Sequence, residues 1–452
     1  MEQQGSPRVC TFHSLSDDLL QQIFSHVLGQ RQRVSLSSVC LRWRSVLRTY
    51  SHMWESLIMR VPRHPYTCFD HLGEQRMDII PWMTSALLWL ARQRLAIESL
   101  ELHGNNSCAC VALLGQLPGL QKLQLVCRLS SPGAMACMQA VLSALPITNP
   151  MMSTIVITQD LEDKHFVTAG LHLCTTPLQY AGRLSDLSLL HKGVSVAEGA
   201  AALASHITGL QHLKVQGNIA KLPALGQLTG LESLWWGQAG ISVSTSELSA
   251  ALRTLSNLTQ VKLDGLAGVT ALELSASRQP RLQELFLKNM VDVQRLPTDM
   301  WNMMGIRTLC LIGECMASAQ PDEWLRCMAH PSCLQPLTSL HTLKLTLFSA
   351  NCPNVITSLV SLTNLRLWWG NGASQNLSCS IPNLSSLHNL RRLHLLPCQP
   401  CSLHTSQLLT MQHLSVLRIT RCPRLDLGGS WPCLARQLSE LKVIELQGST
   451  LI

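Results

Sequence analysis

Two cysteines and two histidines lie close together near the C-terminal end of the chain, and these residue types could hold a metal ion. Their spacing is His394-x3-Cys398-x2-Cys401-x2-His404. Zinc takes thiolate and imidazole ligands in a tight tetrahedral arrangement. His394 falls at a strand-like position, however, and a strand followed by a loop seldom brings four ligands together by chance. We therefore expect no metal site here.

The motifs that commonly indicate catalysis are absent from the sequence. It contains no G-x-x-x-x-G-K-[ST] phosphate loop, no H-E-x-x-H motif and no G-x-S-x-G motif. Its acidic residues fall at no repeated spacing that would pair a general acid with a general base. We therefore predict that the chain is not an enzyme and requires no cofactor.

One repeated pattern, L-x-x-L-x-L, determines the elements that position all of these residues. It recurs at least fourteen times, in units that begin at 97, 120, 152, 184, 210, 231, 258, 282, 306, 340, 362, 390, 414 and 441. Alternating apolar positions mark a short strand, since successive side chains point to opposite faces. Helical spacing between strands, as in 246–255, predicts helices on the other side. Stacked units can bury the apolar face that one unit alone cannot.

This pattern resembles the leucine-rich-repeat family, whose units are of similar length. The family places Asn or Cys three residues after the last strand leucine, in a buried position that bonds to the loop backbone. Asn105, Asn218, Cys398 and Cys422 occupy that position here. The expected fold class is therefore α/β, with a curved leucine-rich-repeat solenoid of about 14 units and parallel strands on its concave face.

The residue between the last two apolar positions of each unit should point to the open concave face. From the fifth to the thirteenth unit this position is basic or aromatic at eight of nine places, and none is acidic. Such a surface suits an acidic or phosphorylated segment with an apolar anchor. A solvated face with incidental charge is the alternative. The predicted substrate-binding residues are Lys214, Trp235, Lys262, Phe286, Lys344, Arg366, His394 and Arg418.

A different pattern occupies the N-terminal segment 12–58. A first helix is predicted from apolar spacing at 19–27, with Ser16 as its cap and acids in the first turn. A second helix is predicted around 36–43, and a third segment ends at Trp54. Three short helices cannot hide so much apolar surface internally, so part of that surface is expected to contact a partner.

The order of these segments resembles an F-box, with its L-P-x-E-L-L-x-x-I-F and V-C-x-x-W-R elements. The second element is complete at 39–44, whereas Ser16 replaces the usual proline and Asp18 stands where Glu is commoner. The resemblance implies binding to the Skp-type adaptor of a cullin-based ubiquitin ligase. By position, it implies a contact surface, or the core behind it, made of Leu15, Leu19, Leu20, Ile23, Val27, Val39, Cys40 and Trp43.

The remaining composition sets the expected domains and compartment. We predict a three-helix F-box at 12–58, a linker at 61–81 and the solenoid at 82–452, beginning with a capping helix at 82–95. Eighteen cysteines without an export signal indicate free thiols in a reducing compartment. With no apolar stretch long enough to span a membrane, we expect a cytoplasmic or nuclear protein.

These patterns together predict the substrate receptor of a ubiquitin ligase. The F-box would bind the adaptor and through it the cullin, and the repeats would bind a target protein for ubiquitin-dependent degradation. Two alternatives remain at this stage. One is a receptor of the same architecture that also needs a small ligand, and the other is a ligase-independent scaffold that binds protein or nucleic acid through the net charge of +8.

Overall fold

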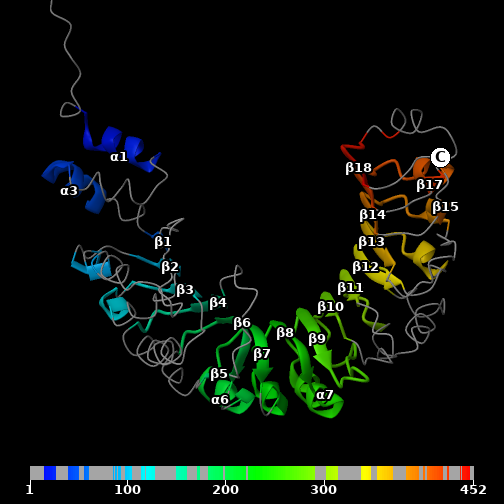
Figure 1. Cartoon of the computed structure of the whole chain (residues 1–452), viewed down its shortest axis with the longest axis horizontal. Coiled ribbons are helices and arrows are strands. Elements are labelled where there is room, and N and C mark those ends of the chain that lie inside the picture. The colour runs from blue at the N-terminus through cyan, green and yellow to red at the C-terminus, as the bar shows by residue number, and fades with distance from the viewer. Residues whose placement is uncertain are drawn as a thin grey trace, which may run out of the picture. The chain divides into compact units, whose positions relative to one another are not determined.

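The computed structural model divides the chain into two compact units, Met1–Phe166 with Pro177–Leu184, and Val167–Thr176 with Ser185–Ile452. Figure 1 shows the elements along the chain. The residues described are 15–26, 39–49, 55–60, 85, 87–88, 90–92, 97–103, 113–117, 119–127, 149–159, 171–173, 182–196, 199–219, 222–290, 302–313, 337–347, 354–369, 383–396, 401–402, 405–420, 425–426, 438 and 440–447.

Two helices are described in the N-terminal segment, α1 (Asp17–Ser25) and α3 (Leu41–Thr49). Helix α3 overlaps the helix predicted around 36–43 only at its start and extends beyond it. Ser16 caps α1 as expected, because its hydroxyl accepts a hydrogen bond from the Leu19 amide. Leu20 and Phe24 are buried on one face of α1. The Phe24 ring meets the Trp43 ring of α3 edge to face, with 5.2 Å between centroids. The three-helix arrangement as a whole stays a prediction.

The first unit also contains four parallel strands, β1 (Ser56–Arg60), β2 (Ser99–His103), β3 (Lys122–Cys127) and β4 (Thr154–Gln159). Strand β1 was not predicted, and its first residues fall inside the segment expected to be the F-box. Leu57 of β1 is buried and aligned with Leu100 of β2. The described residues between 85 and 92 are helical, as expected for the capping helix, but β1 precedes them in the chain. The sheet therefore begins before that helix.

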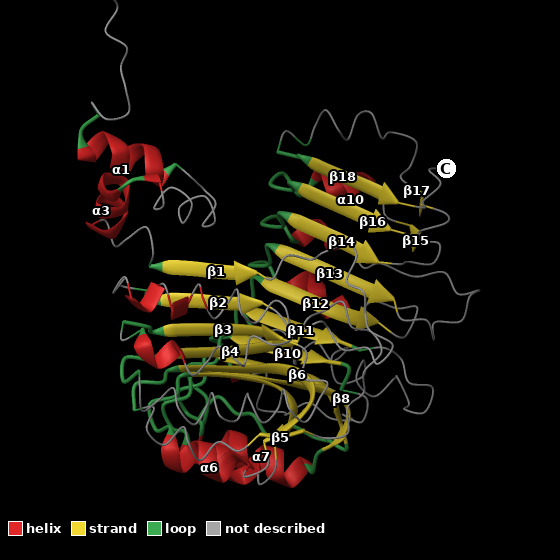
Figure 2. Cartoon of the chain, turned by 60° about the vertical axis from the view of Figure 1, so that its left-hand side comes forward, coloured by secondary structure: helices red, strands yellow, loops and turns green. Residues whose placement is uncertain are grey.

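The second unit carries eleven strands in one parallel sheet, with Leu171–Leu173 (β5) paired to the first of them (Figure 2). Their order along the chain is also their order in the sheet: β6 (Asp186–Val196), β7 (His212–Ile219), β8 (Ser233–Ser242), β9 (Gln260–Ala267), β10 (Glu284–Lys288), β11 (Thr308–Ile312), β12 (Thr342–Leu347), β13 (Asn364–Trp369), β14 (Arg392–Leu396), β16 (Val416–Thr420) and β18 (Val443–Gln447). The short strands β15 (Cys401–Ser402) and β17 (Leu425–Asp426) pair separately. All fourteen predicted units therefore contain a strand.

Helices occupy several of the described connections between these strands. In the second unit they are α6 (Gly199–His206), η6 (Leu222–Gln227), α7 (Thr245–Thr254), η8 (Asn354–Ser358), η9 (Leu384–Ser386) and α10 (Thr405–Leu409). Helix α7 confirms the helix predicted at 246–255, and it buries Leu248, Ala251 and Leu252. Neighbouring connections pack on each other, as α6 and α7 do on η6. Within the described residues, no helix has the length and apolar content needed to cross a membrane.

A recurring backbone contact joins each sequence repeat to the next repeat. The Glu232 carbonyl accepts hydrogen bonds from two successive amides of the following unit, Thr259 at 2.8 Å and Gln260 at 3.1 Å. The same arrangement recurs in the second unit at the carbonyls of Ser185, Gln211, Thr259, Gln283, Arg307, His341, Thr363, Arg391 and Ser415. This contact is made at the start of each strand and does not involve the connection that follows it. Connections of different length can therefore link strands that stay aligned.

Candidate functional site

One residue from each strand of the second unit lies in a continuous row across the sheet, which we call the central row. Pairing between adjacent strands aligns it residue by residue. From Ser188 to Arg418, each member stands between two buried apolar residues, as Arg366 does between Leu365 and Leu367. The row runs Ser188, Lys214, Trp235, Lys262, Phe286, Cys310, Lys344, Arg366, His394, Arg418 and Glu445. It includes all eight predicted substrate-binding residues.

The sequence contains two Trp-Trp-Gly segments, at 235–237 and 368–370, and their tryptophans are aligned differently with the central row. In the first, Trp236 is buried and its indole N–H donates to the Gly217 carbonyl at 2.8 Å, which leaves Trp235 in the central row. In the second, Arg366 occupies the row, and Trp368 lies two residues farther along β13 on the same face. The Arg366 guanidinium carbon is 4.2 Å from the centre of the Trp368 ring.

Lys262 and Phe286 form a mixed cationic and aromatic contact in the first half of the row. The Lys262 ammonium lies 4.4 Å from the centre of the Phe286 ring and 4.0 Å from a carboxylate oxygen of Glu284. In a neighbouring position, Lys288 pairs with Asp264 at 3.0 Å. Acidic residues beside the row therefore offset part of its charge. These acidic residues were not predicted, because the prediction used only the one position in each repeat that lies between the last two apolar residues.

The C-terminal half of the row combines a paired and an unpaired arginine. Arg418 forms an ion pair with Glu445, 2.9 Å from Nε to the carboxylate. Arg366 is different, since its Nε is buried and has no hydrogen-bond partner in the described part of the chain. Burial lowers the pKa of Arg366 below its ordinary value, and the nearby positive charge of Arg418 lowers it further.

His394 lies between Arg366 and Arg418 in the row, with both ring nitrogens buried and, within the described residues, unpartnered. Burial lowers the pKa of His394 to about 4, and Arg366, Arg418 and Arg392 act in the same direction. The carboxylate of Glu445 opposes them only weakly. His394 is therefore neutral at physiological pH.

Cys310 is the one row position from Lys214 to Arg418 that is neither basic nor aromatic. Burial and the neighbouring positive charges have opposite effects on the pKa of its thiol. Burial raises the pKa of the Cys310 thiol to about 11, although Lys344 and Arg366 favour the thiolate. We expect Cys310 to resist iodoacetamide at pH 7.5 in the native chain and to react after denaturation, because only the thiolate is nucleophilic. Peptide mass spectrometry measures this directly. Alkylation of native Cys310 as fast as that of a free cysteine would contradict it.

The histidine and cysteine cluster is only partly described. Cys398 and His404 lie outside the described residues, as do Asn105 and Cys422, while Cys401 begins β15. His394 stands in a row with two arginines, which is an unfavourable place for a metal cation. Within the described residues, no group of three or more candidate ligands could hold a metal. The expectation that the chain has no metal site stays a prediction, and metal analysis of the purified chain would check it.

The residues predicted to bind the adaptor divide into surface and core. Leu19, Ile23 and Val39 expose 47%, 40% and 60% of their surface. Leu20 is buried and belongs to the core behind them. Leu15, Cys40 and Trp43 are half-buried, and Val27 lies outside the described residues. Leu41 was not predicted, yet 79% of it is exposed.

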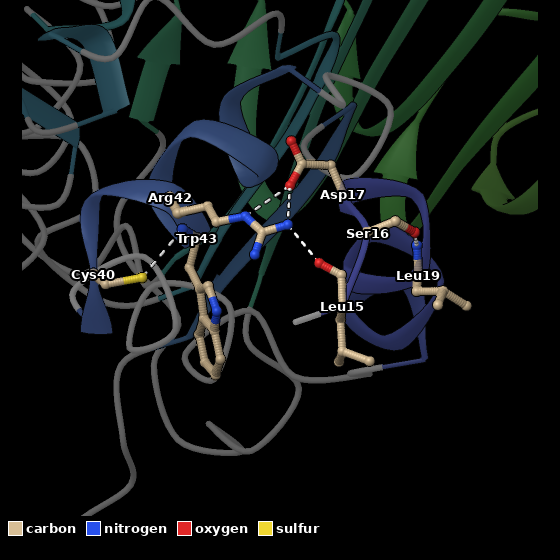
Figure 3. Close-up of polar contacts among 7 residues, drawn as sticks. All are labelled: Leu15, Ser16, Asp17, Leu19, Cys40, Arg42 and Trp43. Atoms are coloured by element: carbon tan, nitrogen blue, oxygen red, sulfur yellow. Dashed lines mark hydrogen bonds and ion pairs between the residues drawn. The ribbon is translucent and has the colours of Figure 1, made fainter. Parts of the chain in front are cut away.

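Arg42 joins α3 to the start of α1. Its guanidinium donates to a carboxylate oxygen of Asp17, 2.9 Å from Nε and 2.7 Å from Nη2, and also to the Leu15 carbonyl (Figure 3). The Trp43 amide donates to the Cys40 sulfur at 3.4 Å, at the start of α3. Sequence analysis identified Asp17 only as a residue of the first helical turn. Its contact with Arg42 links the start of α1 to α3, alongside the Phe24–Trp43 ring contact.

Comparisons with known proteins find similarity among solved structures only. No protein-family model matches the chain, and no curated protein matches it. Among solved structures, it is similar to an internalin from Listeria monocytogenes, at 16% identity and a TM-score of 0.41, over 81% of this chain and 94% of that one.

Two plant receptors are also similar. One is the peptide hormone receptor RGFR1 in complex with RGF2, at 14% identity and a TM-score of 0.41, over 80% of this chain and 61% of that one. The other is the leucine-rich-repeat ectodomain of GASSHO1/SCHENGEN3 from Arabidopsis thaliana, at 14% identity and a TM-score of 0.31, over 78% of this chain and 50% of that one. The chain thus spans less than two thirds of either receptor chain. The fold is defined here by the repeated L-x-x-L-x-L pattern and by the one aligned parallel strand that each repeat contributes.

Proposed function

We propose that this chain is a non-catalytic substrate receptor of a cullin-based ubiquitin ligase of the SCF type. In this proposal α1, α3 and the residues around them bind the Skp-type adaptor, and the central row binds the target protein. The chain would act in the cytoplasm or nucleus, where such ligases work. Its contribution is proximity, since it holds target lysines near a charged conjugating enzyme.

The observation that carries the proposal is the exposure of apolar side chains on and beside two short helices. Leu19 and Ile23 lie on α1 next to the buried Leu20 and Phe24, so α1 has apolar residues on more than its core face. Exposed apolar side chains that cluster on a small domain are typical of a binding surface. The intact V-C-x-x-W-R element at 39–44 supports the choice of partner, because it is the part of the F-box pattern that this chain matches fully.

Co-purification with endogenous partners tests the proposal. The tagged full-length chain, isolated from cells treated with a proteasome inhibitor, is expected to bring down a Skp-type adaptor and a cullin in near-equal amounts. Target proteins should accumulate in the same fraction, because the inhibitor blocks their destruction. Mass spectrometry identifies all three classes. Absence of adaptor and cullin, together with RNA binding that weakens steeply with salt, would instead favour a ligase-independent nucleic-acid-binding scaffold.

A ligand-dependent receptor is distinguished in the same preparation. If target binding survives dialysis of the purified complex, no small diffusible molecule is required. If the target dissociates on dialysis and rebinds when a cell extract free of protein is added, the receptor needs a ligand.

A further inference from the structure

Of the basic side chains in the central row, four lack an acidic partner within the described residues: Lys214 on β7, and three that lie together on adjacent strands. Lys262 and Arg418 each approach a glutamate. Between them, Lys344 on β12, Arg366 on β13 and His394 on β14 are aligned as direct neighbours. Within the described residues no ion pair is found for any of these three, although the Lys344 ammonium lies 6.0 Å from the Phe286 ring centre. Two positive charges, Lys344 and Arg366, and the neutral ring of His394 therefore lie side by side in the row.

The arginine in this group is held in position by an aromatic ring. The Trp368 ring, 4.2 Å from the guanidinium carbon, takes up one face of Arg366 and leaves the edge of the guanidinium to make hydrogen bonds. The Nε of Arg366 is buried from water and has no hydrogen-bond partner among the described residues. Such a group is costly in the free protein and gains strongly from an acceptor.

His394 is the third member of this group, and the number of hydrogen bonds that it can donate depends on its protonation. Neither ring nitrogen of His394 has a described partner, so the ring could donate one hydrogen bond when neutral and two when protonated. The charged groups around it are Arg366 on β13, Arg392 on its own strand, Arg418 on β16 and Glu445 on β18. Three of these four are positive, and the single carboxylate is already paired with Arg418.

We infer that Lys344, Arg366 and His394 form a binding site for one tetrahedral dianion, a phosphate ester on a side chain of the target, and that His394 takes up a proton when the dianion binds. This inference rests on the proposed function, since the target protein delivers the phosphate. Three donor groups on three strands match the several acceptor oxygens of a phosphate better than the two oxygens of a carboxylate.

The pH dependence follows from the charges. In the free chain His394 is neutral at pH 7, because its pKa is about 4. A bound dianion offsets the repulsion from the arginines and raises the pKa of His394 toward its ordinary value. The bound state therefore holds more protons than the free state at mildly acidic pH. By linkage, affinity for an anion whose own charge stays constant, such as sulfate, rises as pH falls from neutral toward 5, whereas a phosphate ester also takes up a proton itself near a pH of about 6.

Calorimetric titration of the full-length chain with sodium sulfate tests this inference. Sulfate is used because its charge does not change between pH 5.5 and 7.5, and sodium chloride keeps the ionic strength constant. We expect one site that binds sulfate about fivefold more tightly at pH 5.5 than at pH 7.5. Acetate should bind far more weakly. Titrations in buffers with different ionisation enthalpies should show net proton uptake at pH 5.5.

Three variants separate the parts of the inference. Arg366→Gln should remove sulfate binding at both pH values, and Arg366→Lys should restore part of it. His394→Gln should keep binding at pH 7.5 but lose most of its pH dependence. Arg253→Gln is the matched control, because Arg253 is an exposed arginine that pairs with Glu273 away from the row and should leave the titration unchanged.

Several outcomes would overturn the site. These are no sulfate binding, binding that Arg366→Gln does not change, or a pH dependence that persists in His394→Gln. Displacement of sulfate by a short single-stranded RNA but not by a phosphoserine peptide would assign the site to nucleic acid instead. Adaptor and cullin take no part in this titration. If sulfate does not bind but the adaptor and cullin still co-purify, the anion site is wrong and the proposed function stands. If sulfate binds but the adaptor and cullin do not co-purify, the proposed function is wrong and the anion site stands.

Discussion

Replacing both Leu19 and Ile23 by aspartate is expected to abolish co-purification of the Skp-type adaptor and the cullin. Both side chains are substantially exposed, so the buried residues of α1 are not disturbed. In the complex, however, each new carboxylate would be buried against an apolar surface at a cost of several kcal/mol. Since about 1.4 kcal/mol corresponds to a tenfold change in affinity, the double variant should show no detectable binding.

Gln22→Asp is the control for this experiment. Gln22 is an exposed neighbour of Ile23 on α1, and its replacement introduces one of the two negative charges that the double variant adds. It should retain the adaptor if binding depends on the apolar side chains rather than on the net charge of the helix. Circular dichroism and the melting temperature establish that each variant is folded. Adaptor binding by a folded Leu19→Asp/Ile23→Asp chain would show that the F-box interpretation is wrong.

Reversing two charges in the central row, Lys344→Glu with Arg366→Glu, is expected to release the target while leaving the adaptor bound. These two positions are preferred to Arg418 because Arg418 already pairs with Glu445 and has less charge to offer. Each lost charge-assisted hydrogen bond to the target removes about 1.5–3 kcal/mol, and repulsion from the new carboxylates adds to that loss. Together the two changes should weaken target binding by more than about a hundredfold.

Quantitative mass spectrometry of co-purified proteins compares this variant with the unmodified chain. Arg253→Glu serves as its control, because it reverses a charge outside the row in the same unit. Adaptor and cullin should be recovered equally from all three. Should the variant and the unmodified chain retain the same set of targets, target capture must lie outside the central row, and the connections between strands become the next place to test.

The strands could be predicted because their signal is local. Two apolar residues separated by one polar residue fix both the strand and the face of each side chain, and the spacing of units then aligns the row. Strand β1 was not predicted because Trp54 and Met59 stand at the first and last leucine positions of its L-x-x-L-x-L pattern. It also follows directly on a segment whose helical pattern suggested a different domain.

Side-chain contacts between adjacent strands could not be predicted, since they depend on residues far apart in the chain. Lys288 is 24 residues from Asp264, and Arg418 is 27 residues from Glu445, yet each pair lies on adjacent strands. Which leucine of α1 faces inward depended likewise on where α3 packs, so Leu20 was grouped with exposed neighbours. Leu41 was overlooked because the F-box pattern leaves its position unspecified.

Strand spacing across the central row sets a length scale for any chain that lies along it. Adjacent strands are about 4.8 Å apart, so Lys344 and His394, two strands apart, are separated by about 10 Å. A polyproline II segment advances about 3.1 Å per residue and turns once in three residues, so every third side chain returns to the same side after about 9 Å. In a fully extended segment, side chains return to the same side after about 7 Å. This spacing does not match the distance between alternate strands of the row. The row therefore favours ligands whose contact residues recur at every third position, and it disfavours the alternating pattern of a β-strand.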